Sequence, residues 1–199
     1  MKTLVVLNGE CNNLDFLKRL SEKFDKIVCA DGGYLHTVSA GVKPDTVVGD
    51  FDSSNLPENI QSVVFPKEKD LSDAEIAIEY AKNYYGNDIT LTCSLGKRLD
   101  HQLFNVFLLA KYPDIIIEES DVIVFLCKTY TDFSKFNGKT VSFFPIEKSN
   151  LTLKNFKYNL VEQDVQQGNT VTLSNIALVN AAVNVNSGKV IAIINKNDV

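Results

Sequence analysis

Acidic residues stand where apolar, strand-like runs of this sequence give way to polar segments. In GDFDS at 49–53, Asp50 and Asp52 directly follow such a run. Alternate side chains of an extended segment share one face, so these two carboxylates would point the same way. They would repel each other unless a cation lay between them, and all-oxygen ligand sets favour Mg²⁺ or another hard metal. The pair therefore predicts a metal site, and the alternative is an Asp-rich turn in which Asp52 and Ser53 cap the next segment.

Two further junctions lie at predicted helix starts. Asp70 and Asp73 flank one of them, where exposed amides and the helix dipole favour carboxylates whether or not they have a function. At the other, the Arg98 guanidinium could hold phosphate oxygens while Asp100 orients it. His101 follows directly, and we expect it to form supporting hydrogen bonds rather than to act as an acid or base. Each junction alone is compatible with structural capping.

The fourth junction is Asp31 with Gly32 and Gly33. Glycines let a ligand approach the backbone, and a helix that begins there would offer amide groups to an anion. Capping tolerates Ser, Thr and Asn as well as Asp, so capping alone does not explain four acidic junctions in one part of the chain. Together they predict a site that binds a metal ion and phosphate groups.

The elements that must position these junctions are predicted to be βα units around a mostly parallel sheet. Ligands of open α/β sheets bind at the carboxyl ends of the strands, where the acidic residues stand. Ser72 and Glu75 have the spacing of a capping box, which predicts that a helix begins at Asp73. The other predicted strands are 3–7, 26–30, 46–48, 89–93, 115–117 and 122–126, and the other predicted helices are 14–24, a short one ending near Gly41, and 100–111.

After about residue 129 the helical spacing disappears, and short alternating segments follow one another. These segments predict an all-β domain, with strands at 140–144, 150–153, 169–173 and 190–194. The expected domains are therefore 1–129, an α/β domain with flanking helices, and 130–199, a smaller all-β domain. A small β domain exposes strand edges that another chain can cover, so we expect dimerisation through this part.

Composition excludes several classes of protein. The chain has 20 Lys and Arg against 25 Asp and Glu, a net charge of −5, which lacks the basic footprint of a nucleic-acid-binding protein. No apolar stretch approaches the length of a membrane span or a signal peptide. The four cysteines lack metal-ligand spacing, which favours free thiols in a cytoplasmic protein. Dinucleotide-binding, Walker, zinc-protease, kinase and α/β-hydrolase motifs are absent from the sequence.

Four motifs, taken together, resemble those of the thiamin pyrophosphokinase family. They are ADGG at 30–33, PDTVVGDFDS at 44–53, KDLSDAE at 69–75 and SLGKRLDHQLFN at 94–105. In the second domain, GKTVSFFP at 138–145, FKYNL at 156–160 and SN at 174–175 are similar to the family's β-domain signatures. The resemblance implies transfer of pyrophosphate from ATP to the thiamin hydroxyl, Mg²⁺ dependence, a homodimer and a C-terminal β-sandwich.

The resemblance also implies roles for individual residues. The expected metal ligands and catalytic residues are Asp50, Asp52 and Asp73, with Arg98 and Asp100 acting around the transferred phosphates. The expected ATP-binding residues are Asp31, Gly32, Gly33, Lys69, Asp70, Arg98 and His101, and the expected thiamin-binding residues are Tyr158, Ser174 and Asn175.

Three positions depart from the family pattern. Ser72 stands where Thr is usual, which keeps the hydroxyl and the cap. Lys97 and Asn155 stand where Gly is common, and we expect a side chain at Lys97 to be excluded if the backbone there needs a positive φ. These changes affect substrate detail more than the class of reaction.

Two alternatives to the pyrophosphokinase reaction stay open at this point. One is a Mg²⁺-dependent phosphohydrolase, because DFDS at 50–53 is superficially similar to an aspartyl-phosphate site, although that class places its DxD after the first strand. The other is a module that binds a nucleotide or thiamin without turnover.

Overall fold

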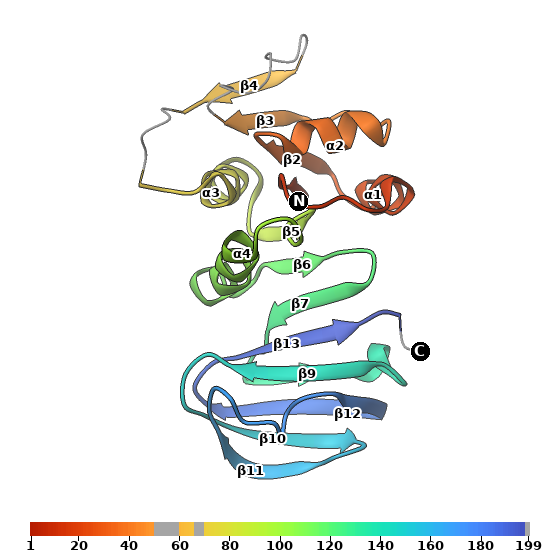
Figure 1. Ribbon diagram of the computed structural model, residues 1–199, viewed down its shortest axis with the longest axis vertical. Helices are drawn as coiled ribbons and strands as arrows, with labels where there is room; N and C mark the ends of the chain where they lie inside the picture. Colours follow the sequence, from red (N-terminus) through yellow and green to blue (C-terminus); the bar gives the residue numbers. More distant parts are fainter. Residues whose placement is uncertain (50–59, 66–69, 198–199) are drawn as a thin grey trace. The chain divides into compact units, whose positions relative to one another are not determined.

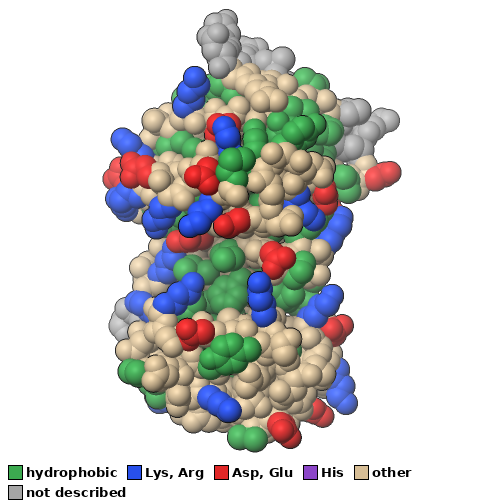
Figure 2. All heavy atoms as spheres, turned by 180° about the vertical axis from the view of Figure 1, so that it is seen from behind, with side chains coloured by type: hydrophobic (Ala, Val, Ile, Leu, Met, Phe, Trp, Pro, Cys, Tyr) green, Lys and Arg blue, Asp and Glu red, His purple; other side chains and the backbone are tan. Residues whose placement is uncertain are grey.

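The computed structural model describes residues 1–49, 60–65 and 70–197 (Figure 1). The chain divides into two compact units, Met1–Ser120 and Asp121–Val199. None of the helices among the described residues is long and apolar enough to cross a membrane. On the face drawn in Figure 2, Lys and Arg side chains are interspersed with Asp and Glu, and no extended basic patch forms there.

The first unit is built on a parallel sheet, as the sequence predicts. Strand pairs give the order β6-β5-β1-β2-β3-β4. The helices are α1 and α2 in the first half, and α3 and α4, which flank β5 in the chain (Figure 1). Their bounds are β1 Lys2–Val6, α1 Leu14–Ser21, β2 Lys26–Ala30, α2 Gly33–Ser39, β3 Thr46–Gly49, β4 Gln61–Val64, α3 Asp73–Tyr85, β5 Asp88–Thr92, α4 Leu99–Lys111 and β6 Ile116–Glu118.

Local sequence signals explain where α3 begins. Ser72 is the N-cap, and its hydroxyl accepts a hydrogen bond from the Glu75 N–H at 3.2 Å. The Glu75 carboxylate in turn accepts one from the Ser72 N–H at 3.1 Å, which completes the predicted capping box. The same carboxylate pairs with Lys111 at the end of α4, at 2.9 Å. Glu75 therefore ties together α3 and α4, two of the helices that follow acidic junctions.

The sequence analysis missed β4 and set helix ends a few residues off. Strand β4, Gln61–Val64, is an edge strand with two exposed residues, so it lacks the continuous apolar run of its neighbours. The first helix ends at Ser21, earlier than the predicted 24, with its cap at Glu22. Helix α4 begins at Leu99, one residue before the predicted start.

The second unit is all-β, as predicted. Strands β7, β13 and β9 pair antiparallel in that order, and β11, β10, β12 and β8 form a second antiparallel set. Both sets contribute to one core, in which Phe133 contacts Phe143 and Phe156. The bounds are β7 Val122–Leu126, β8 Tyr130–Asp132, β9 Thr140–Pro145, β10 Ser149–Phe156, β11 Leu160–Val165, β12 Asn175–Ser187 and β13 Val190–Asn195, with a 3₁₀ turn at Ser134–Phe136.

Two sequence predictions differ from this unit. The predicted strand at 169–173 is wrong, because the segment is folded into turns by a hydrogen bond from Leu173 N–H to the Thr170 carbonyl at 3.0 Å. Its apolar alternation arises from Val171 and Leu173, which are exposed. Strand β7, which we placed with the first domain, pairs with β13 inside the second unit. The structural division therefore falls between Ser120 and Asp121, ahead of the predicted boundary after 129.

Candidate active site

A cavity of about 690 Å³ lies at the carboxyl ends of β1, β2 and β5, within the first unit. Three of the four acidic junctions meet there, because parallel strands deliver their following loops to one edge of the sheet. The volume is within the range of small-molecule sites. The polar lining includes Asp31, Asp73, Ser94, Lys97, Arg98, Asp100 and His101.

Arg98 and Asp100 form a two-point ion pair at the mouth of this cavity. The Arg98 Nη2 and Nε atoms lie 2.6 Å and 3.2 Å from the Asp100 carboxylate oxygens. The Asp100 carboxylate also accepts the His101 backbone N–H at 3.0 Å. Hydrogen bonding from Arg98 lowers the pKa of Asp100 to about 2, so the pair stays charged at any neutral pH. Both side chains are well exposed, which leaves the guanidinium accessible to a phosphate group.

Asp73 lines the cavity from the first turn of α3. Helix capping does not account for it, since Ser72 is the N-cap. Asp70 is exposed and is not part of the cavity lining. Asp70 and Asp73 both flank the predicted helix start, but only Asp73 lines the cavity.

Asp31 lines the cavity, whereas Gly32 and Gly33 do not. Packing requires Gly33, because a Cβ there would lie 2.2 Å from the Val6 carbonyl oxygen, and a Cβ at Gly32 would displace the Asn8 side chain, 2.5 Å away. Their role in the described structure is close contact between the start of α2 and the end of β1.

Asp50, Asp52 and Lys69 lie outside the described residues. Their neighbours show where the chain leaves β3: the Asp31 N–H donates to the Val48 carbonyl at 2.8 Å, and a Cβ at Gly49 would lie 3.2 Å from the Asp31 Cα. Gly49, the last described residue before Asp50, thus lies directly beside Asp31. Among the described residues alone, no three acidic, His or Cys side chains are grouped closely enough to hold a metal ion.

Sequence reasoning missed the residues that hold the loop at 93–98. The Glu119 carboxylate accepts hydrogen bonds from the Cys93 N–H at 3.0 Å and from the Ser94 N–H and hydroxyl at 2.8 and 2.9 Å. Burial raises the pKa of Glu119, and these donors oppose that rise. Asn105 donates to the Ser94 carbonyl at 2.7 Å. The pair of acids after the apolar run at 115–117, of which Glu119 is the second, was the available signal.

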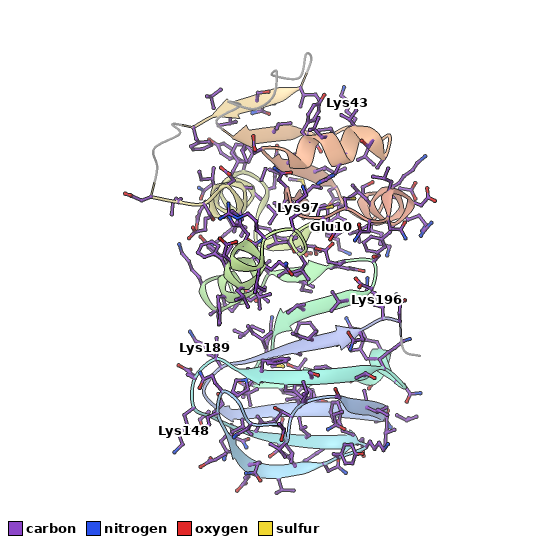
Figure 3. The ribbon with its side chains drawn as sticks, viewed as in Figure 1. Glu10, Lys43, Lys97, Lys148, Lys189 and Lys196 are labelled. Carbon is purple, nitrogen blue, oxygen red and sulfur yellow. The ribbon has the colours of Figure 1, made fainter. Side chains whose placement is uncertain are left out.

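Lys97 occupies a left-handed backbone conformation, with φ +60°. The expectation that a positive φ would exclude a side chain here is wrong. The loop keeps the glycine-like conformation and tolerates a lysine, at a cost of about 1–2 kcal/mol. The Lys97 side chain is labelled in Figure 3, and its ammonium group donates to the Asn8 carbonyl at 3.1 Å.

Next to this contact, the His36 ring nitrogen Nε2 lies 3.0 Å from the Gly9 carbonyl oxygen. Burial lowers the pKa of His36, and the nearby Lys97 charge acts in the same direction. His36 holds the loop after β1, and it does not line the cavity.

The second unit brings Tyr158, Ser174 and Asn175 together. Asn175 is buried, and its side-chain amide accepts the Tyr158 N–H at 3.0 Å and donates to the Tyr158 carbonyl at 2.7 Å. Ser174 has φ +55°, and its N–H donates to the Ser142 hydroxyl at 2.9 Å. The Tyr158 ring is exposed. Asn175 therefore fixes the backbone that carries the exposed Tyr158 ring.

Comparisons with known proteins agree on one family over nearly the whole chain. The family model for the thiamin pyrophosphokinase catalytic domain matches residues 17–126, and the model for the thiamin pyrophosphokinase vitamin B1 binding domain matches residues 127–191. A thiamine pyrophosphokinase of Bacillus subtilis (strain 168) is 28% identical over 191 residues, covering 88% of this chain and 89% of that protein.

Solved structures give the same result for the fold. The thiamin pyrophosphokinase of Geobacillus thermodenitrificans superposes with a TM-score of 0.84 at 26% identity, covering 100% of this chain and 99% of the other. The Bacillus subtilis thiamine pyrophosphokinase structure gives 0.82 at 22% identity, with both chains covered completely.

Proposed function

The chain belongs to the thiamin pyrophosphokinase family, and from this premise we propose how its residues carry out the family's reaction. It is an ATP-dependent transferase that moves a pyrophosphate group from ATP to the hydroxyl of thiamin, giving thiamin diphosphate and AMP. The observation that carries the assignment of residues is the convergence of Asp31, Asp73, Arg98 and Asp100 on one cavity of the catalytic domain.

The reaction is an in-line attack of the thiamin hydroxyl on the β-phosphorus of ATP, with AMP as the leaving group. Phosphoryl transfers of this kind depend mainly on positioning and charge neutralisation. Arg98 is suited to both, because Asp100 fixes its guanidinium plane while both side chains stay exposed. It would hold phosphate oxygens of the transferred or leaving group.

Mg²⁺ is part of the proposal. Asp73 at the cavity, together with Asp50 and Asp52 just beyond Gly49, would supply the carboxylate oxygens that this ion prefers. The contact of Gly49 with Asp31 supports this choice, because Gly49 directly precedes Asp50 in the sequence and Asp31 lines the cavity. When bound, the ion would neutralise charge on the phosphate oxygens. Asp31 would line the nucleotide side, with Lys69 and His101 near the phosphates.

The second unit would bind thiamin through Tyr158, Ser174 and Asn175. The buried Asn175 amide supports this role by fixing the Tyr158 backbone, so that an exposed aromatic ring is available to a flat heterocycle. Ser174, with its backbone in a left-handed conformation, would contribute its hydroxyl or backbone beside the ring.

A homodimer in the cytoplasm completes the proposal. Leu99, Leu103 and Phe107 form an apolar face of α4 that is 68%, 51% and 54% exposed, and apolar faces of this kind favour contact with another chain. The sequence analysis expected dimerisation through the β unit instead. All four cysteines are free thiols, which suits a reducing compartment.

The test is chromatographic detection of AMP and thiamin diphosphate from purified protein with ATP, Mg²⁺ and thiamin, with EDTA and no-thiamin controls. We expect both products in equal amounts and their loss with EDTA. Inorganic phosphate in place of AMP would indicate a phosphohydrolase, and saturable binding without products would indicate a sensing module.

A single substitution tests the metal site. We expect Asp52→Asn to lower turnover at least about a hundredfold, because it removes one charged group at the phosphates. Near-native turnover would remove Asp52 from the site, and Asp73→Asn, within the described residues, provides the parallel test.

A further inference from the structure

Lys97 carries a backbone strain that a glycine would avoid. Its φ of +60° lies in the left-handed region, where a β-carbon is unfavourable. Strained residues of this kind cluster at ligand sites, which indicates a functional role for the Lys97 side chain. Gly96, directly before it, also has a positive φ, of +82°, and a Cβ there would lie 2.3 Å from the Glu10 Cβ. The loop is therefore closely packed, and its conformation is fixed around Lys97.

Lys97 differs in its partners from two other cations of the first unit. Arg98 is paired with Asp100, and Lys111 with Glu75. Within the described ranges 1–49, 60–65 and 70–197, no carboxylate lies within ion-pair distance of the Lys97 ammonium. Its contacts are to Asn8, whose carbonyl oxygen is 3.1 Å away and whose side-chain oxygen is 3.5 Å away. An ammonium group at a cavity wall whose hydrogen-bond partners are neutral oxygens is available to attract an anion.

We propose that the Lys97 ammonium group binds the phosphates of ATP beside Arg98 and so increases the affinity of this chain for the nucleotide. This inference rests on the proposed function for the identity of the anion. The hydrogen bond to the Asn8 carbonyl positions the ammonium nitrogen at the cavity, and an ammonium group has three donors, so phosphate oxygens can take the others. The Asn8 side-chain oxygen, at the limit of hydrogen-bond distance, is the contact most readily exchanged.

The experiment compares ATP affinity by calorimetric titration for the wild-type protein and for Lys97→Ala, Lys97→Arg and Lys97→Gly. We expect Lys97→Ala and Lys97→Gly to weaken ATP binding about tenfold or more, and Lys97→Arg to retain most of the affinity, because a charge-assisted hydrogen bond is lost only in the first two. The difference between Lys97→Ala and wild type should shrink at high salt, since exposed charges are screened.

Lys97→Gly separates charge from backbone conformation, because glycine accepts the left-handed loop without strain and keeps the fold. Asn155→Gly is the matched control: Asn155 has φ +58° in the second unit, so the same relief of strain should leave ATP affinity unchanged. The proposal would be overturned if Lys97→Gly or Lys97→Ala bound ATP as tightly as the wild type. It would also be overturned if Lys97→Arg lost as much ATP affinity as Lys97→Ala, or if the wild type did not bind ATP.

These binding measurements need no turnover. If ATP binds in a Lys97-dependent way but no thiamin diphosphate forms, the inference holds and the proposed reaction fails. If thiamin diphosphate forms and ATP affinity does not depend on Lys97, the reaction holds and the inference fails.

Discussion

The two units hold their candidate ligand-binding residues by different physical means. In the first unit the charged side chains of Lys97, Arg98 and Asp100 are exposed at the loop before α4 and in its first turn, and their positions depend on an ion pair and on a contact with a backbone carbonyl. In the second unit one buried neutral amide, that of Asn175, fixes the backbone beneath an exposed ring.

This difference follows from the ligands. Phosphate groups carry charge that develops and moves during the reaction, and accessible charges next to a cavity can respond to it. A flat heterocycle needs a rigid surface, and a fully bonded buried amide provides rigidity without charge. We therefore expect substitutions in the first unit to change turnover with little effect on folding, and those in the second unit to change both folding and thiamin binding.

The largest effect is expected for Arg98→Ala. Loss of a preorganised cation at the phosphates should lower turnover at least about a hundredfold. The free energy of unfolding should hardly change, because the ion pair is exposed and such pairs contribute little to stability. Steady-state kinetics and urea unfolding measure the two quantities, with Arg19→Ala on the exposed surface of α1 as the control. A large loss of unfolding free energy in Arg98→Ala would contradict the expectation that substitutions at the first unit's site leave folding almost unchanged.

Asn175→Ala should show the opposite combination. The Tyr158 N–H and carbonyl would lose their partners, which costs about 1–3 kcal/mol of unfolding free energy, and the KM for thiamin should rise. ATP affinity should stay the same, and the effect should not depend on salt. Asn186→Ala is the matched control, because Asn186 lies on the same strand but is exposed. If only ATP affinity changed, the assignment of this site to thiamin would be wrong.

A smaller effect is expected from Ser72→Ala, which removes the N-cap of α3. The cost should be about 1 kcal/mol of unfolding free energy. Turnover should also fall, because the cap sets the position of Asp73, the next residue. Ser72→Thr keeps the hydroxyl and should restore both quantities in unfolding and kinetic measurements. Equal losses in the Ala and Thr variants would show that the hydroxyl is not what positions Asp73.

The two units also differ in how much of their structure could be predicted from the sequence. In the first unit the parallel sheet, the capping box and the convergence of the acidic junctions were predicted, because each rests on local sequence signals plus one topological rule. The packing roles of Gly32 and Gly33 were not predicted, because the contacts that a Cβ would make with Asn8 or Val6 arise only in the tertiary structure. The buried carboxylate of Glu119 was missed because its partners lie more than 20 residues away in the chain.

The second unit was predicted less well in detail. Its β class was clear, yet turns at 169–173 imitate the alternation of a strand. The long strand β12, Asn175–Ser187, pairs with β8, β9 and β10 in turn, and such pairings depend on contacts that alternation cannot reveal. Asn175 itself was found only through the resemblance to a family.

The smallest expected effect concerns pH and also separates the units. Burial lowers the pKa of His36, so the unfolded chain binds its proton more readily than the folded chain. The stability that neutral His36 provides is complete above pH 6.5 and is lost as the pH falls from there through the lowered pKa. Urea unfolding at pH 7.5 and 6 should therefore show a loss in the wild type that is absent in His36→Gln, which keeps a donor for the Gly9 carbonyl but does not titrate. The second unit contains no histidine, so a probe confined to that unit, such as amide hydrogen exchange in β12 of the wild type and of His36→Gln, should show no His36-dependent change. An equal response in both units would mean that they unfold as one, and that the contrast between them is confined to ligand binding.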